Sequence, residues 1–371
     1  MYARRRPTLI LVRPRGTPGY SRRVKPVAVR ILHPASTATS GLLERALGTA
    51  RSENARQLAT LFEAAGAGDV RIEEGQPDGR SFGERLRGLV AGLPDAAGLV
   101  VFGSGSIPLA RAHDAGELVA VAASGERRAL ANNRYSADVV AIGAASALAS
   151  VPDLPSDNAL PRWLEEEAGF KVDDLRRRWR LAIDLDSPLD VLLTGGEPAG
   201  IATGAVRDRV ERIRAVAADR RAELVVAGRT SAGTLRWLER NTASRTRALV
   251  EERGLRAIGL VDSGANRPPR STLGLVLDDR GPEALGAMLA ELGDAGLIDT
   301  RVLLAHRLGA DEAGWPPPED RYASDLLLAE QVRDPWLRAL TASARDSAIP
   351  VLLGGHTLVG PGVRLVLGRR A

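Results

Sequence analysis

The sequence predicts two α/β domains: the first is built on a mixed, mostly parallel sheet with helices on both faces, and the second is smaller. Short apolar runs alternate with amphipathic segments along the 371 residues, which is typical of strands and helices in α/β layers. The length exceeds what one hydrophobic core normally supports. The composition, 44% hydrophobic and 26% charged, is that of a globular chain and excludes global disorder.

Composition also excludes several classes of protein. The chain has no cysteine, which rules out disulfide scaffolds, thiolate zinc sites and cysteine nucleophiles. No apolar run reaches the roughly 18 residues that a membrane helix needs. The apolar stretch Leu9–Val12 is too short for the core of a signal peptide. We therefore expect a soluble cytoplasmic protein with no membrane partner.

The positive charge is concentrated at the N-terminus. The formal net charge is +5, and nine basic residues with no acidic residue precede Glu44. A basic arm over residues 1–26 attracts phosphates, but few aromatic residues interrupt it and no nucleic-acid-binding signature follows. We interpret it as a solvated leader and expect no nucleic-acid partner. The sequence leaves the oligomeric state open.

In the first half, the expected elements follow one another in order. Gly66 ends one amphipathic helix, and Ser81 with Glu84 has the spacing of a capping box at the start of the next. We expect strands at 27–32, 70–73, 99–102, 118–122, 138–142 and 180–184, and helices at 53–65, 81–93 and 162–168.

A glycine-rich loop, Thr-Gly-Gly-Glu-Pro-Ala-Gly at 194–200, is expected to separate a domain at 27–195 from a second at 205–371. The alternation then continues. We expect helices at 205–222, 231–253, 282–292, 324–332 and 335–346, and strands at 223–227, 273–277, 298–304 and 351–353.

Two segments beside expected strands carry the residues that phosphate and metal binding need. His33–Gly41 is rich in hydroxyl groups and leads into a helix, where backbone N–H groups together with Ser36 and Ser40 suit a phosphate. Simple N-capping by Ser40 explains the same pattern. Asp184 and Asp186 stand two apart at an expected strand end, so both side chains point the same way and suit a hard cation such as Mg²⁺. Capping of the following helix is the alternative.

These residues carry a resemblance to a known family. Arg180–Asp190, Arg-Leu-Ala-Ile-Asp-Leu-Asp-Ser-Pro-Leu-Asp, resembles the Leu-Asp-x-Asp-Thr-Pro-x-Asp segment of the 2-phospholactate and phosphoenolpyruvate guanylyltransferases. Those enzymes are nucleotidyltransferases with a glycosyltransferase-A-like fold. Gly105-Ser-Ile-Pro108 resembles the family's Gly-Asp-x-Pro, Asn132 and Asn133 stand where it has Thr-Asn, and Ser156 lies in the segment matching its Gly-x-x-Ser loop.

The resemblance spans about residues 25–195. It implies a nucleotide-diphospho-sugar-transferase-like fold and a nucleotidyltransferase-like enzyme that joins a nucleotidyl group to a small phosphorylated or carboxylated acceptor. Its implied partners are a nucleoside triphosphate and that acceptor, with Asp184 and Asp186 holding Mg²⁺. The polar side chains expected to bind phosphate or acceptor are Lys25, Ser36, Ser40, Ser104, Ser106, Asn132, Asn133 and Ser156.

Two departures from the family's pattern leave alternatives open. The aspartate of Gly-Asp-x-Pro, a third Mg²⁺ ligand in the family, is Ser106 here, or Gly105 in a one-residue shift. The family's Gly-rich nucleotide loop has only a loose counterpart in Arg15-Gly-Thr17 with Lys25. One alternative is a catalytically degenerate nucleotide- or sugar-binding protein. Another is an interaction module.

The second half resembles no family that we can name. Gly354-Gly-His356 follows one expected strand, and His306 follows the apolar run Val302–Ala305. If both runs are neighbouring parallel strands, His306 and His356 converge at one sheet edge, with Asp325 at a helix start, and form a second ligand pocket. Structural roles for both histidines are the alternative.

Overall fold

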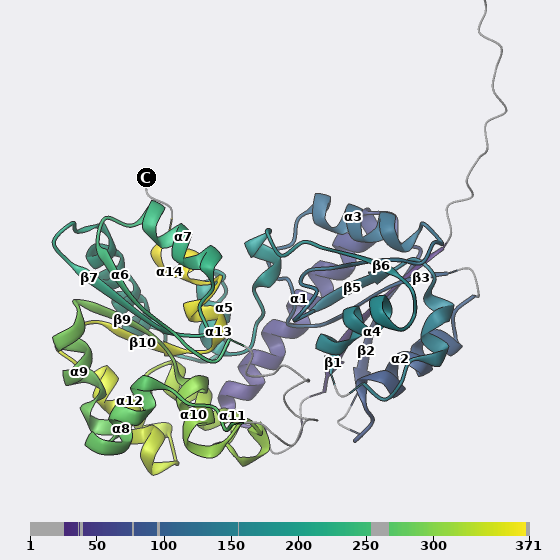
Figure 1. The fold of residues 1–371 in the computed structure, drawn as a ribbon. Coiled ribbons are helices and arrows are strands. Elements are labelled where there is room, and N and C mark those ends of the chain that lie inside the picture. The colour runs from purple at the N-terminus through teal and green to yellow at the C-terminus, as the bar shows by residue number, and fades with distance from the viewer. Residues whose placement is uncertain are drawn as a thin grey trace, which may run out of the picture.

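In the computed structural model the chain folds around two separate sheets (Figure 1). The structure describes residues 26–35, 37, 40–75, 78–94, 97–154, 156–253 and 267–368. One sheet has six strands in the order β2-β1-β3-β5-β4-β6, and the other has four in the order β10-β9-β7-β8. The predicted fold class is confirmed.

The first sheet is mixed and mostly parallel. Its strands are β1 (Val27–Pro34), β2 (Asp69–Gly75), β3 (Gly98–Gly103), β4 (Arg128–Ala131), β5 (Val139–Ile142) and β6 (Lys171–Asp174). Neighbours run parallel except for β5, which is antiparallel to both β3 and β4.

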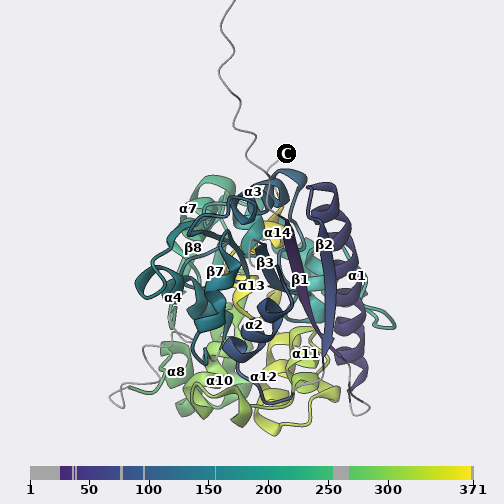
Figure 2. The same cartoon turned by 90° about the vertical axis from the view of Figure 1, so that its right-hand side faces the viewer.

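Helices cover both faces of this sheet, which explains why its central strands are apolar throughout. On one face pack α1 (Leu42–Ala64) and α3 (Ala112–Ala122); on the other pack α2 (Phe82–Ala91) and α4 (Leu160–Glu166). Figure 2 shows α1 lying alongside β1 and β2. The capping box predicted for Ser81 and Glu84 is present at the start of α2.

Two 3₁₀ turns, η1 (Ala145–Ser150) and η2 (Asp157–Ala159), lie between β5 and α4. After β6, the 3₁₀ turn η3 (Trp179–Ala182) and the helix α5 (Pro188–Leu193) lead toward the second sheet. A capping box formed by Ser187 and Asp190 begins α5, so Ser187 and not Asp186 caps this helix.

The second sheet is wholly parallel. Its strands are β7 (Glu223–Gly228), β8 (Arg245–Val250), β9 (Ala295–Asp299) and β10 (Val351–Gly354). The helices around it are α6 (Gly204–Ala218), α7 (Ala232–Asn241), α8 (Thr272–Arg280), α9 (Leu285–Leu292), α10 (Thr300–Leu308), α11 (Pro318–Asp325), α12 (Pro335–Arg345), α13 (His356–Val359) and α14 (Val363–Leu367).

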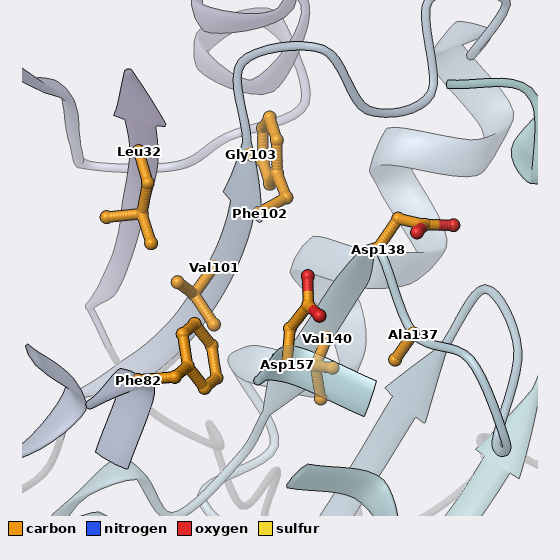
Figure 3. Close-up of a pocket in the computed structure, with 9 residues that line it drawn as sticks. All are labelled: Leu32, Phe82, Val101, Phe102, Gly103, Ala137, Asp138, Val140 and Asp157. Atoms are coloured by element: carbon orange, nitrogen blue, oxygen red, sulfur yellow. The ribbon is translucent and has the colours of Figure 1, made fainter. Parts of the chain in front are cut away.

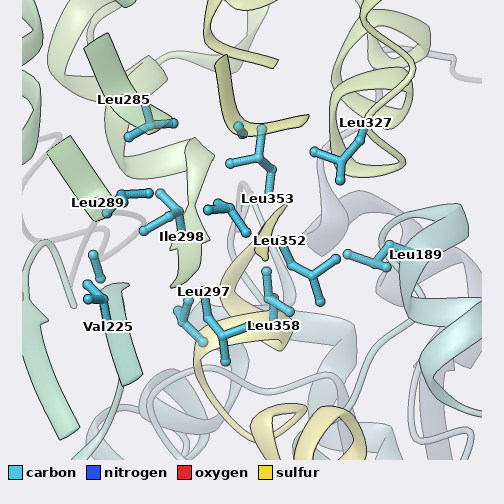
Figure 4. Close-up of a cluster of buried hydrophobic side chains, with 14 of the residues drawn as sticks. Leu189, Val225, Leu285, Leu289, Leu297, Ile298, Leu327, Leu352, Leu353 and Leu358 are labelled. Carbon is cyan, nitrogen blue, oxygen red and sulfur yellow. The ribbon is translucent and has the colours of Figure 1, made fainter. Parts of the chain in front are cut away.

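The core of the second sheet draws on residues from the first half of the chain. Leu43 of α1 and Leu189 of α5 are both fully buried in it. Figure 4 shows Leu189 pointing toward Leu352 and Leu358. The two sheets are therefore joined by apolar packing as well as by the chain.

Several expected elements are wrong. Residues 118–122 end α3, residues 273–277 lie in α8, and residues 302–304 lie in α10, all of which were expected to be strands. A short apolar run has the same appearance in a buried helix as in a buried strand. The helix expected at 231–253 ends at Asn241 and is followed by β8.

Two further differences affect the candidate sites. Residues 180–184 form η3 and an isolated bridge in place of a full strand. Asp325 is the last residue of α11 and does not begin a helix. Within the described part of the chain, no helix has the length and apolar character needed to cross a membrane.

Candidate functional site

Polar residues gather where β1 and β3 end, which is the edge at which open α/β sheets bind ligands. His33, in β1, places its Nδ1 2.9 Å from Oγ of Ser104, the residue after β3. Asn54 of α1 donates to the carbonyl oxygens of Ser104 (2.8 Å) and Ser106 (3.1 Å). The loop after β3 is thus fixed to both β1 and α1.

The same loop lies directly against Asp184. Ser106 and Asp184 pair as an isolated antiparallel bridge, and the N–H of Leu185 donates to the carbonyl of Gly105 over 2.9 Å. A Cβ on Gly105 would stand 3.0 Å from Oδ1 of Asp184, so glycine permits this close approach. Two of the segments that carry the family resemblance therefore meet at one point.

Asp184 is in an unusual electrostatic setting. Its Oδ1 is buried and has no hydrogen-bond partner. Burial, and then the neighbouring carboxylates of Asp186 and Asp138, raise the pKa of Asp184 well above its ordinary value. Crowded carboxylates disfavour one another's ionised form until a positive charge joins them, so this group of side chains favours binding of a cation.

Arg51 of α1 already supplies part of that charge. Its Nη2 lies 3.6 Å from Oδ1 of Asp186, and its Nε donates to the carbonyl of Leu185 over 2.8 Å. Sequence reasoning missed Arg51 because no motif contains it. Its spacing from Asn54 places both on one helix face, and that face is the one turned toward the ends of the strands.

A divalent cation fits this arrangement only with help from other ligands. In the part of the chain that the structure describes, no group of three or more His, Asp or Glu side chains is arranged to hold a metal ion. Asp184 and Asp186 supply two carboxylates. Two protein ligands are enough for Mg²⁺ when water molecules and substrate phosphates fill the other positions of its octahedral coordination shell. The unpartnered Oδ1 of Asp184 fits that role, and Asp186 is accessible, with 55% of its side chain exposed.

A small cavity lies at the same sheet edge, on the face that α2 covers. Its volume is about 130 Å³, below the roughly 300–1,000 Å³ of ordinary ligand pockets. Figure 3 shows Leu32, Val101 and Phe82 lining its apolar side, with the carboxylates of Asp138 and Asp157 nearby. This cavity has room for one small group of a larger ligand.

The two asparagines expected to bind an acceptor have structural contacts. Oδ1 of Asn132 accepts the N–H groups of Asp138 and Val139, while its Nδ2 donates to Asp138 and Leu181. Asn133 accepts the N–H of Tyr135. The buried side chain of Asn132 holds the turn between β4 and β5 together.

The remaining residues of the expected phosphate site are more widely spread. Ser40 does not cap α1: the N-cap is Gly41, and Oγ of Ser40 lies 3.3 Å from the N–H of Thr37. Ser156 precedes η2, whose first residue, Asp157, lines the small cavity. Lys25 and Ser36 lie outside the described residues.

The start of α1 is held by a carboxylate from the second half of the chain. The N–H groups of Leu43 and Glu44 donate to Oε1 and Oε2 of Glu319, each over 3.0 Å. Glu319 belongs to α11. No pattern in the sequence links residues this far apart, so sequence reasoning did not find this contact.

The edge of the second sheet is occupied by buried ion pairs. Arg229, after β7, binds both carboxylate oxygens of Asp299 at 2.7 and 3.1 Å. Arg301 binds Asp325, with Nη2 2.7 Å from Oδ2. The side chains of Asp299 and Asp325 are wholly buried, and bidentate pairing with arginine compensates for that burial.

The structure does not bring His306 and His356 to one pocket. His306 lies in the last turn of α10 and does not follow a strand; its Nδ1 accepts the N–H of Ser271, and its Nε2 lies 2.9 Å from Oδ2 of Asp278. His356 begins α13, after β10. The expected pair of neighbouring parallel strands is wrong, because residues 302–305 are helical and belong to α10.

Charged residues at the carboxyl edges of the two sheets nevertheless affect pKa values across both edges. Desolvation and Arg229 lower the pKa of His356, and the carboxylates of Asp299 and then Asp186 partly offset that shift. Burial raises the pKa of Tyr322 in α11, and the positive charges of Arg51 and Arg301 oppose that shift. Tyr322 also packs against Leu185. The first site therefore faces polar residues of the second sheet.

No protein-family model matches this chain, and no curated protein matches it.

Proposed function

We propose that the edge of the first sheet is a nucleotidyltransferase-like site, which binds a nucleoside triphosphate with Mg²⁺ and transfers the nucleotidyl group to a small phosphorylated or carboxylated acceptor. The observation that carries the proposal is the buried Oδ1 of Asp184, which has no partner and lies beside Ser106 among mutually repelling carboxylates. The resemblance of these segments to the guanylyltransferase motifs supports the type of reaction.

The residues have distinct roles in this proposal. Asp184 and Asp186 would hold the cation, which neutralises charge on the triphosphate. Arg51, 3.6 Å from Asp186, would move onto a phosphate when the cation takes its place. An acceptor oxygen attacks the α-phosphorus, the bond from that phosphorus to the bridging oxygen breaks, and pyrophosphate leaves.

A second candidate is nucleotide binding without transfer. Ser106 stands where the family has its third carboxylate, and transfer relies on stabilising charge that develops in the transition state. Losing one carboxylate weakens the hold on the cation more than the hold on the nucleotide. The contact between Arg51 and Asp186 also favours this candidate, because it partly balances the charge without a metal.

Calorimetry with each nucleoside triphosphate, with and without Mg²⁺, followed by a pyrophosphate-release assay, tests both candidates. Asp184→Asn should remove the Mg²⁺ dependence of binding, and Asp153→Asn, an exposed acid of the same domain, is the matched control. Pyrophosphate release that depends on an acceptor supports transfer. Binding that depends on Mg²⁺ without release supports the second candidate, and the absence of any Mg²⁺-dependent binding contradicts both.

Ser106→Asp separates the candidates further. It restores a carboxylate beside Asp184, and we expect Mg²⁺ to bind about tenfold more tightly as a result. If the natural chain binds nucleotide without turnover and the variant releases pyrophosphate, the missing carboxylate is the cause. Unchanged Mg²⁺ affinity would show that position 106 does not face the cation.

A further inference from the structure

We infer that His356 of the second domain binds the acid group of the acceptor, so that the acceptor lies between the carboxyl edges of the two sheets. The inference rests on the proposed function, which places the nucleotide at the edge of the first sheet. It gives the second domain a role in recognising the acceptor. The ligand chemistry is that of an oxyanion, either a phosphate or a carboxylate group.

The imidazole of His356 has hydrogen-bonding capacity that the fold does not use. Its side chain is exposed to solvent, and within the described residues neither ring nitrogen has a hydrogen-bond or ion-pair partner. The other three histidines, His33, His113 and His306, each contact a polar group of the chain. An accessible imidazole with two open nitrogens can therefore bind a ligand without first breaking a contact of the fold.

Charged residues from the carboxyl ends of the other three strands surround this imidazole. Arg229 follows β7, Arg253 follows β8 and Asp299 ends β9. Desolvation and Arg229, with a smaller effect of Arg253, lower the pKa of His356 to about 4, and Asp299 and Asp186 oppose that shift. Asp299 is already bound by Arg229 through both oxygens. The positive charge of the exposed Arg253 and the N–H of the imidazole therefore favour an anionic ligand.

Packing places His356 close to the proposed cation site. A Cβ on Gly354, two residues before His356, would stand 3.3 Å from Cδ2 of Leu189 in α5. Figure 4 shows Leu189 pointing toward Leu358 of α13, the helix that His356 begins. The start of α5 lies two residues after Asp186, whose charge acts on His356. An acid group held by His356 would therefore lie on the side of the second sheet that faces the cation.

Nuclear magnetic resonance of the histidine rings tests the inference in the full chain, because the chain has only four histidines and His356→Ala assigns one of the signals. Inorganic phosphate and malonate are the probes, one for each kind of oxyanion. At least one probe should shift the His356 signal saturably at pH 7 and raise the pKa of His356 to about 5 or higher, because a bound negative charge favours the protonated imidazole. The signal of His113, whose side chain is 74% exposed, is the internal control and should not move.

Two variants measure the contribution of each group to binding of that probe. His356→Ala should weaken it about tenfold, and Arg253→Gln about threefold, because the charge that it removes is exposed. His113→Ala is the matched control and should leave the affinity unchanged. Both changed residues are exposed, so urea unfolding should give the same stability for each variant as for the natural chain. The inference is overturned if neither probe moves the His356 signal, or if His356→Ala binds both probes as the natural chain does.

The outcomes separate this inference from the proposed function. Asp184→Asn should remove Mg²⁺-dependent nucleotide binding and leave the effect of the probes on His356 unchanged. If nucleotide binds with Mg²⁺ and neither probe reaches His356, the proposed function stands and the inference fails. If a probe binds at His356 and no nucleotide binds with Mg²⁺, the proposed function fails and the oxyanion site remains as a ligand site of the second domain.

Discussion

Asp114 holds the arginine-rich segment that leads to Asp184. Its carboxylate is 1% exposed, receives Arg178 at 2.8 Å and Arg180 at 3.2 Å, and accepts the N–H of Arg111 at 2.9 Å. Burial alone would raise the pKa of Asp114, but the Arg111 N–H and the two guanidinium groups outweigh it and lower the pKa. These arginines are therefore engaged with protein carboxylates.

Asp114→Asn should destabilise the fold by about 2–4 kcal/mol at pH 7, because it leaves the partly buried Arg180 without its carboxylate partner and Arg178 with Glu117 alone. Since the folded-state pKa of Asp114 lies below its unfolded value, the contribution is complete above about pH 4 and is lost as the pH falls further. Urea unfolding at pH 7 and pH 3 measures both effects. A difference between variant and natural chain that is the same at both pH values would contradict the explanation.

At this scale the sequence identified some residues of the site and not others. Asp184 and Ser106 could be identified from the sequence because they lie in motifs with a recognisable order. Arg51 and Glu319 lie in ordinary helical segments, and their importance comes from contacts across 134 and 276 positions. Only the folded chain reveals such contacts.

At the scale of elements, α2 is positioned by one glycine. Gly83 lies in its first turn, and its N–H donates to the carbonyl of Leu154. A Cβ there would stand 1.9 Å from the carbonyl oxygen of Pro152. The backbone of α2 thus packs directly against the backbone of the 152–154 loop. This contact holds Phe82 at the edge of the small cavity.

Two alanine substitutions in α2 should have opposite effects. Gly83→Ala should lower the free energy of unfolding by about 1–3 kcal/mol, because the added methyl group overlaps the backbone of the 152–154 loop. Gly88→Ala, where a Cβ meets nothing within 4 Å, should stabilise by about 0.5–1 kcal/mol, because alanine favours helix. Denaturant unfolding measures both, and a stabilising Gly83→Ala would refute the close packing.

Elements with a clear local signal were predictable, and the others were not. The cap at Ser81 is where the sequence placed it. Strand β8 was missed because its Arg-Thr-Arg start at Arg245 lacks the apolar run of a buried strand; it lies at the sheet edge, where polar side chains reach solvent. Residues 302–305 were wrongly predicted as a strand for the opposite reason. They form a continuous apolar run because α10 is buried on most sides.

At the scale of the whole molecule, the two sheets are joined by more than the Glu319 contact. Arg364 of α14 lies between two indole rings, with Cζ 5.2 Å from the Trp179 centroid and 5.8 Å from the Trp237 centroid. Trp179 belongs to η3 in the first half and Trp237 to α7 in the second. Cation–π stacking of this kind adds to the apolar packing.

Leu43 gives the strongest test of this coupling, because it belongs to α1 and yet is fully buried in the core of the second sheet. Leu43→Ala should cost about 2–5 kcal/mol and should accelerate amide exchange in β9 and β10, far away in sequence. The adjacent Leu42, 48% exposed, is the matched control, and Leu42→Ala should change stability by less than about 0.5 kcal/mol. If Leu43→Ala accelerates exchange in β1 and β3 only, the two sheets unfold independently and a ligand bound at the first cannot act on the second through this packing.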